Sequence, residues 1–154
     1  MSDETHPLIA PSRTPEADAA VTPDPEPDAL PAPGLVLVVD DDDLVRWGTA
    51  RKLRRAGYEV LEAAGADEEL ICMQEHGASV SLVLSDVIMP KQTGYELCQA
   101  VHARWPHAQI LLISGYTPVA MQRHGIQTEG FWLLQKPVDD LPGAVRRLIG
   151  PPLL

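Results

Sequence analysis

LVLVVDDDD, residues 35–43, is the stretch that decides the fold. Its first half, Leu35–Val39, is a continuous apolar and largely β-branched run, which is typical of a strand covered on both faces. Four aspartates follow directly at residues 40–43. We therefore predict a buried parallel strand whose carboxyl end carries a group of acids.

The same change from apolar run to polar loop recurs towards the C-terminus, with helical segments between the runs. The expected strands are Leu35–Val39, Tyr58–Ala63, Val80–Ser85, Ile110–Ser114 and Phe131–Gln135. The expected helices are Leu44–Ala56, Ala66–His76, Tyr95–Trp105, Pro118–His124 and a last one, capped by Asp139 or Asp140, that runs to about Ile149. Five strands alternating with helices predict an α/β domain with a parallel sheet covered on both faces.

Residues 1–34 have a different composition from the rest of the chain. They hold eight of the 15 prolines, seven of the 22 acids and one of the 12 bases, and no aromatic residue. Such a segment cannot bury enough apolar surface to offset the entropy of ordering it. We predict a disordered tail over residues 1–34, a folded domain over 35–150 and a short C-terminal end over 151–154. A tether or spacer is the favoured role of the tail, with recruitment of a partner as the alternative.

Charge and cysteine content exclude several classes of function. The formal net charge of −10 argues against a nucleic-acid surface, which needs clustered cations, and against a helix that docks on anionic lipid. Cys72 and Cys98 are too few for a disulfide scaffold or a four-thiolate zinc site. No apolar run approaches the roughly 20 residues that span a bilayer, and the N-terminus does not resemble a secretory signal. We expect a cytoplasmic protein with no nucleic-acid or membrane partner.

Polar side chains stand where the expected strands end. They are Asp40, Asp41, Asp86, Ser114 and Lys136. Each has an ordinary explanation by itself, such as a helix cap, a turn former or a surface cation. In a parallel sheet, however, the carboxyl ends of the strands lie along one edge, where ligands bind. We therefore expect these five side chains to converge.

Phosphoryl transfer to a carboxylate is the chemistry that needs this set. Adjacent carboxylates repel unless a hard cation joins them, and Mg²⁺ prefers oxygen ligands. We predict a Mg²⁺ site at Asp40, Asp41 and Asp86, with Asp86 as the nucleophile. Lys136 and Ser114 would stabilise the negative charge of the transferring group.

The motifs resemble, in order and spacing, those of the receiver domain of two-component response regulators. The residues that carry the resemblance are Val38-Val39-Asp40-Asp41-Asp42, then Leu84-Ser85-Asp86-Val87-Ile88-Met89-Pro90 with Gly94, then Ile113-Ser114-Gly115-Tyr116, then Gln135-Lys136-Pro137. The resemblance covers residues 35–150 and is strongest to receivers attached to hybrid histidine kinases. We expect a flavodoxin-like, doubly wound sheet of strand order 2-1-3-4-5 with five helices.

The resemblance also implies roles for individual residues. Asp86 would be the phosphoacceptor, Asp41 a direct Mg²⁺ ligand, and Asp40 a ligand directly or through water. The backbone carbonyl of Ile88 would be a further ligand.

Ser114 would be the switch hydroxyl and Lys136 the cation of the site. The Lys136–Pro137 peptide bond is expected to be cis. Leu133 stands where the family often has an aromatic residue, so an aromatic rotation on phosphorylation is not expected at that position.

Partners and output follow from the same resemblance. The phosphoryl group would come from a histidine kinase or a histidine phosphotransferase, and the chain would not be a turnover enzyme. Since the chain ends directly after the last expected helix, we expect output by protein contact or onward phosphotransfer. The expected contact surface comprises Pro118–Arg123, Phe131–Leu134 and Leu141–Ile149.

Three alternatives remain open at this stage. The chain could be the receiver module of a hybrid histidine kinase, although Met1 favours a free-standing protein. It could be a phosphorylation-independent binding module of the same fold. It could be a Mg²⁺-dependent phosphatase, but Ile88 occupies the position where such an enzyme carries its general acid.

Overall fold

The computed structural model describes residues 8, 34–88, 94–126 and 130–152. Five parallel strands form one sheet in the order β2-β1-β3-β4-β5, which confirms the predicted fold class. The strands are β1 (Leu35–Val39), β2 (Glu59–Ala63), β3 (Leu82–Asp86), β4 (Gln109–Ser114) and β5 (Trp132–Gln135). The helices are α2 (Asp43–Arg55), α3 (Ala66–His76), α4 (Gly94–Arg104), α5 (Pro118–Arg123) and α6 (Leu141–Ile149), with a 3₁₀ turn η3 (Gly77–Ser79).

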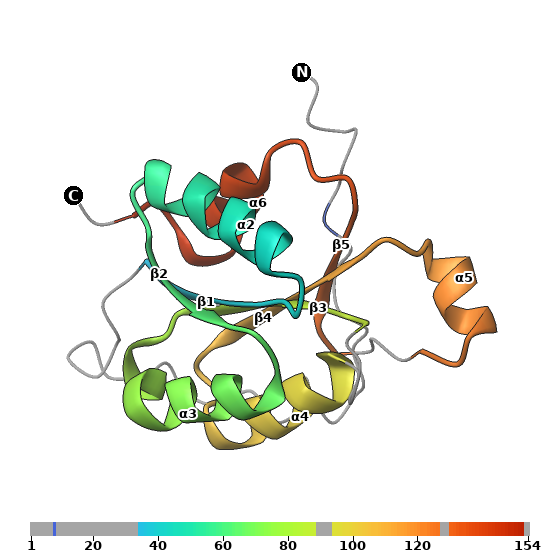
Figure 1. The fold of residues 1–154 in the computed structure, drawn as a ribbon, viewed down its shortest axis with the longest axis horizontal. Coiled ribbons are helices and arrows are strands. Elements are labelled where there is room, and N and C mark those ends of the chain that lie inside the picture. The colour runs from blue at the N-terminus through green and yellow to red at the C-terminus, as the bar shows by residue number, and fades with distance from the viewer. Residues whose placement is uncertain (1–7, 9–33, 89–93, 127–129, 153–154) are drawn as a thin grey trace, which may run out of the picture.

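The helices cover the sheet as two layers. In Figure 1, α2 and α6 lie on one face and α3 and α4 on the other, while α5 projects beyond the β5 edge. Along β1 the side chains alternate between the two faces: Val36 and Val38 pack towards α2 and α6, and Leu37 and Val39 towards α3 and α4. All four are buried, so the apolar run 35–39 is covered on both faces as predicted.

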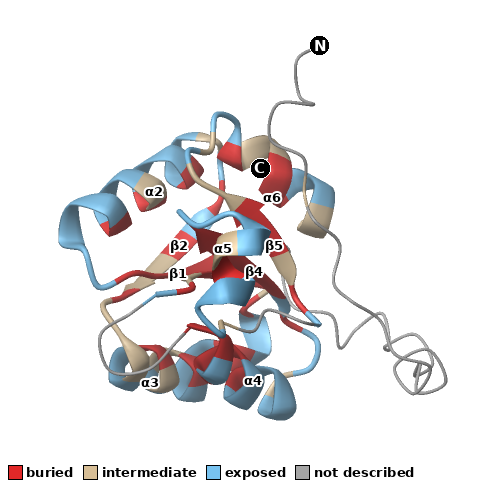
Figure 2. Cartoon of the chain, turned by 90° about the vertical axis from the view of Figure 1, so that its right-hand side faces the viewer, coloured by how far each residue is buried: buried red, intermediate tan, exposed pale blue. Residues whose placement is uncertain are grey.

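The core is accordingly divided into two clusters. The α2–α6 cluster includes Val36, Leu84 and Leu111, and the α3–α4 cluster includes Leu37, Val83 and Leu112. In Figure 2, the buried residues concentrate on the strands and on the helix faces turned towards them. Among the described residues, no helix combines the length and apolar character needed to cross a bilayer.

Most element boundaries agree with the predictions to within one or two residues. β3 shows the largest difference, because it begins two residues later and ends one residue later than the predicted Val80–Ser85. The amide of Val80 closes the unpredicted turn η3 by donating to Gly77 O at 3.2 Å, whereas Asp86 pairs with Ile113 of β4. Asp86 is thus the last residue of its strand.

The ends of the chain are only partly described. Leu8, inside the expected tail, is half-buried against the α2–α6 cluster. The rest of the predicted tail before Gly34, the Met89-Pro90 part of the motif, and the last two residues of the expected C-terminal end lie outside the described residues.

Candidate functional site

The carboxyl ends of β1 and β3 bring three aspartates together. These two strands are neighbours in the sheet, and Asp40, Asp41 and Asp86 stand at their ends. One carboxylate oxygen from each lies within 4.8 Å of the others. Asp40 is buried, Asp86 half-buried and Asp41 exposed, so the group opens to solvent on one side. The predicted convergence of the three carboxylates is therefore found.

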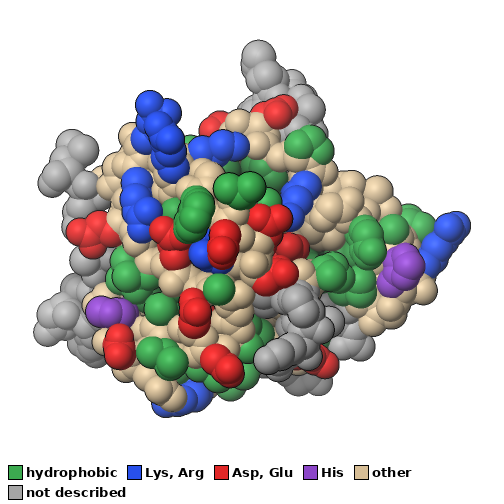
Figure 3. Space-filling model, in the orientation of Figure 1, with side chains coloured by type: hydrophobic (Ala, Val, Ile, Leu, Met, Phe, Trp, Pro, Cys, Tyr) green, Lys and Arg blue, Asp and Glu red, His purple; other side chains and the backbone are tan. Residues whose placement is uncertain are grey.

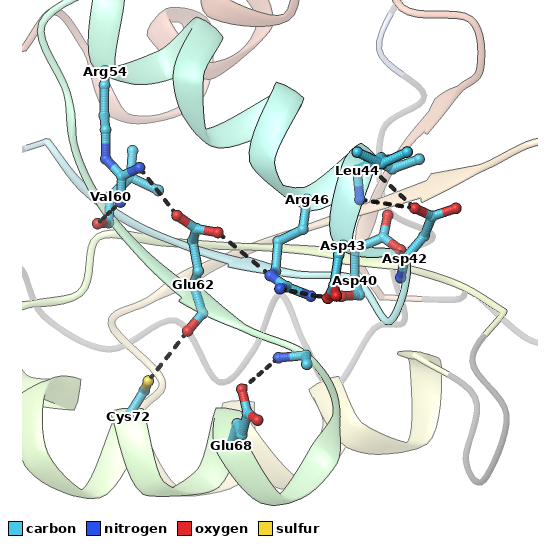
Figure 4. A network of polar contacts seen from close by, with 12 residues as sticks. Asp40, Asp42, Asp43, Leu44, Arg46, Arg54, Val60, Glu62, Glu68 and Cys72 are labelled. Atoms are coloured by element: carbon cyan, nitrogen blue, oxygen red, sulfur yellow. Dashed lines mark hydrogen bonds and ion pairs between the residues drawn. The ribbon is translucent and has the colours of Figure 1, made fainter.

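The turn after β1 is ordered by its own aspartates. Asp42 is the N-cap of α2, and its Oδ1 accepts hydrogen bonds from the amides of Leu44 at 3.0 Å and Val45 at 3.2 Å. Figure 4 shows this cap beside Asp40, whose Oδ1 accepts from the amide of Asp42 at 2.9 Å. Of the four consecutive acids, Asp42 thus caps the helix, whereas Asp40 and Asp41 belong to the acidic group.

Lys136 reaches this group from the end of β5. Its amide donates to Ser114 O at 2.7 Å, and its Nζ lies 3.5 Å from Asp86 Oδ2. The Lys136–Pro137 bond is cis, as predicted. The structure thus places the cation of Lys136 beside Asp86, at the edge of the sheet where the sequence led us to expect it.

Burial and mutual repulsion act on the acids of the site. Burial raises the pKa of Asp40 above its ordinary value, and the charges of Asp86 and Asp41 act in the same direction. Burial also raises the pKa of Asp86, against the opposing charge of Lys136 and the hydrogen bond from the Ile88 amide. A bound divalent cation would relieve both the repulsion and the cost of burying charge.

A cavity of about 500 Å³ opens beside the acidic group. Asp40, Asp86 and Lys136 line it together with apolar side chains such as Val45 of α2 and Leu141 of α6. The carboxylates of Asp40 and Asp86 therefore lie at the edge of a hollow on the α2–α6 face.

The hydroxyl of Ser114 is hydrogen-bonded within its own loop. It is fully buried, accepts a hydrogen bond from the amide of Tyr116 at 2.9 Å, and lies 3.3 Å from Tyr116 O. The predicted hydroxyl is thus at the correct strand end but is held by its own loop. The amide of Ile88 lies 3.4 Å from Asp86 Oδ1, and the ligand role of its carbonyl stays a prediction.

Leu133 is buried in the α3–α4 cluster at the position where an aromatic residue is common. The nearby Phe131 packs edge-on against Tyr95, with ring centroids 5.6 Å apart, and against His102 at 5.9 Å. Its ring is therefore engaged with α4.

Arg46 is the residue of the site region that the sequence interpretation missed. Its guanidinium is buried and donates to Asp40 O at 2.8 Å. Its spacing of three from Asp43 was a signal for an ion pair within the helix. The sequence contained no comparable signal for its contact with the backbone of Asp40.

Comparison with known proteins connects this geometry to one family. The family model described as the response regulator receiver domain matches residues 36–145. A relative, the sensor kinase CckA of Brucella abortus, is 38% identical over 108 residues, which are 70% of this chain and 11% of that kinase. The chain spans between 11% and 57% of the length of this and two further curated relatives.

Solved structures agree with the family match. The chemotaxis protein CheY4 of Vibrio cholerae has a TM-score of 0.64 at 32% identity, covering 77% of this chain and all of that one. The response regulator TrrA of Thermotoga maritima, in complex with Mg²⁺ and BeF, has a TM-score of 0.60 at 25% identity. That match covers 75% of this chain and 98% of TrrA.

Proposed function

We propose, from the premise that the chain belongs to the response regulator receiver domain family, that Asp86 is its phosphoacceptor in His-to-Asp signalling. One observation carries the proposal: Asp40, Asp41 and Asp86 converge at one edge of the sheet, with Lys136 Nζ 3.5 Å from Asp86 Oδ2. The phosphoryl donor is the phosphohistidine of a histidine kinase or of a phosphotransferase.

The acidic group fits a Mg²⁺ ion. Three carboxylates supply the oxygen ligands that Mg²⁺ prefers, and their close approach is otherwise repulsive. Asp40, Asp41 and Asp86 would hold the ion with the carbonyl of Ile88, and the bound ion would neutralise charge on the phosphoryl oxygens.

The chain's own residues perform the transfer. A carboxylate oxygen of Asp86 attacks phosphorus, the P–O bond of the acyl phosphate forms, and the P–N bond to histidine breaks, leaving a neutral imidazole once it has taken up a proton. The Lys136 ammonium lies close enough to Asp86 to bond an oxygen of the transferred group. Ser114 would donate to another oxygen after its hydroxyl leaves Tyr116.

Output would pass by protein contact or onward phosphotransfer in the cytoplasm. Within the expected contact surface, Val119 of α5 is strongly exposed. Tyr116 and His124, which flank α5 in the sequence, stack with their ring centroids 5.2 Å apart. Figure 3 shows hydrophobic side chains gathered on the projecting part of the molecule. The resemblance to CckA, a hybrid histidine kinase with a receiver domain, also favours the alternative that this chain is the receiver of a hybrid kinase.

Phosphorylation with acetyl phosphate and Mg²⁺, read by intact mass, tests the assignment. We expect one added phosphoryl group on the wild type and none on Asp86→Asn, because the amide is no nucleophile. Asp42→Asn is the matched control, since asparagine also caps helices and should retain labelling.

Undiminished labelling of Asp86→Asn would contradict the assignment. Continuous release of phosphate at the wild-type site would indicate a phosphatase instead, and no labelling of the wild type would indicate a binding module.

A further inference from the structure

Arg46 is a buried cation whose side chain joins three parts of the chain. It is 8% exposed, and its Nη1 donates to Asp40 O at 2.8 Å. Its Nη2 donates to Asp43 Oδ1 at 2.7 Å, and its Nε lies 3.4 Å from Glu62 Oε1 of β2. Figure 4 shows the guanidinium between these groups.

Burying a guanidinium costs several kcal/mol unless its donors are paired. Burial lowers the pKa of Arg46, but Asp43 and Glu62 outweigh this and the pKa is raised, so the side chain stays charged. Because the guanidinium is planar and its donors are fixed in direction, three acceptors at once restrict its position strongly.

Asp40 is the residue that this arrangement holds. Its amide donates to Ala63 O at 3.1 Å, its carbonyl accepts from Arg46, and its Oδ1 accepts from the Asp42 amide. The peptide groups on both sides of Asp40 are therefore fixed. Arg46 bonds the carbonyl and balances its charge on Asp43 and Glu62, so it does not occupy the carboxylate of Asp40.

The contacts continue away from the acidic group. Arg54 Nη1 lies 3.0 Å from Glu62 Oε2, and its Nη2 donates to Val60 O at 2.9 Å. Arg54 is half-exposed and is bonded only to β2 in these contacts. The chain thus offers two arginines of one helix that share Glu62, of which only Arg46 reaches Asp40.

We infer that Arg46 is a positioning residue that sets the backbone of Asp40 so that its carboxylate is directed, before any cation arrives, towards Asp41 and Asp86. The inference rests on the proposed function, because it assigns Arg46 to the preparation of the Mg²⁺ site. Removal of a group that orients a metal ligand in this way commonly weakens metal binding by about 10–100-fold. We expect a loss of Mg²⁺ affinity in this range when Arg46 is replaced.

Calorimetric titration of the metal-free protein with Mg²⁺ tests this inference without any phosphoryl donor. Arg46→Met should weaken Mg²⁺ binding by about 10-fold or more. Arg54→Met, the same substitution on the same network, should leave the affinity unchanged. Arg46→Lys should fall between wild type and Arg46→Met, because one ammonium cannot match the fixed fork of donors.

Hydrogen exchange of the metal-free protein gives a second readout. The amides of residues 40–45 should exchange faster in Arg46→Met and at the wild-type rate in Arg54→Met. If circular dichroism shows that Arg46→Met is unfolded, the Mg²⁺ titration and the hydrogen exchange are measured on Arg46→Lys instead.

Equal Mg²⁺ affinity in wild type and in the folded Arg46 variants would overturn the inference. A wild type that binds no Mg²⁺ would instead overturn the proposed metal site. Hydrogen exchange would then still decide whether Arg46 fixes the turn.

Discussion

The two faces of the sheet treat a buried ionisable side chain in opposite ways. On the α2–α6 face, Arg46 is paired with a carbonyl and two carboxylates. On the α3–α4 face, Glu69 is 0% exposed, and neither of its carboxyl oxygens has a hydrogen-bond partner among the described residues. One helix layer therefore pairs its buried charge, whereas the other buries an acid that has no hydrogen-bond partner among the described residues.

The difference decides the protonation of each group. Burial raises the pKa of Glu69 from its ordinary value of 4.5 to about 8, so the acid is mostly neutral at pH 7. Glu69 acts on the thiols of Cys98 in α4 and Cys72 in α3. Burial is the main cause that raises the pKa of each thiol, and the negative charge of Glu69 raises it further. The α2–α6 face therefore has fixed charge beside the acidic group, whereas the α3–α4 face holds a proton.

The pH dependence of stability is the largest effect expected from this contrast. The folded protein keeps a proton on Glu69 that the unfolded chain releases, so the stability it contributes is lost as pH rises from 4.5 to about 8. The loss is at most about 1.4 kcal/mol per pH unit. Urea unfolding of wild type and Glu69→Gln across this range measures it.

The two proteins share every other titrating group, so the shifts of Asp40 and Asp86 cancel in the difference. Wild type should lose stability relative to Glu69→Gln as pH rises. A difference that stays constant with pH would mean that Glu69 is solvated or paired in solution.

A change of intermediate size concerns glycines on the two faces. Gly94 begins α4 with its amide 2.6 Å from Val87 O, and a Cβ there would overlap the backbone carbonyl of Asp86. We expect Gly94→Ala to lower the free energy of unfolding by about 1–3 kcal/mol, because backbone cannot yield as a flexible side chain can. Urea unfolding gives the value, and labelling by acetyl phosphate reports the effect on the site.

Gly48 in α2 is the matched control on the other face. A Cβ at Gly48 meets no atom within 4 Å, so Gly48→Ala should stabilise the protein by about 0.5–1 kcal/mol. If both variants were destabilised by similar amounts, the steric overlap with the carbonyl of Asp86 would not explain the effect at Gly94.

The smallest effect involves a tyrosine hydroxyl on each face. Tyr58 donates to Gly150 O at 2.7 Å across 92 positions of sequence, tying the start of β2 to the end of α6. Tyr58→Phe should cost about 0.5–1.5 kcal/mol. Tyr95→Phe, which loses a contact with Gln99 at 3.1 Å within one helix, should cost less in the same thermal or urea measurement. An equal loss of stability in both variants would show that the hydrogen bond from Tyr58 to Gly150 contributes no more than the contact within α4.

Local pattern was sufficient to predict the strands, the helices and the meeting of Asp40, Asp41, Asp86 and Lys136. Strand order sends these residues to one edge, and alternation along β1 reveals the two covered faces. The η3 turn was missed because Gly77 reads as a helix stop. The late end of β3 was missed because pairing of Asp86 with Ile113 depends on a neighbouring strand.

The local sequence pattern could not predict the environment of individual side chains, because this environment depends on residues that are distant in the sequence. Arg46 and Glu69 both occur in helices beside apolar residues. The spacing of Arg46 from Asp43 indicated one ion pair, but nothing local indicated its contacts with Asp40 and Glu62. Nothing local indicated either that Glu69 would be buried without a hydrogen-bond partner among the described residues. The same holds for Ser114, whose position at the end of β4 was predicted but whose hydroxyl direction depends on the fold of its own loop.

The four aspartates after β1 also have a genetic consequence. Asp40 is held at its amide, carbonyl and carboxylate, Asp41 stands in the acidic group, Asp42 caps the helix, and Asp43 pairs with Arg46. Four identical letters thus carry four separate duties. A deletion of one aspartate would leave the composition of the run almost the same, yet it would reassign every duty at once. In this turn the spacing is the inherited information, and the apparent redundancy offers no spare copy.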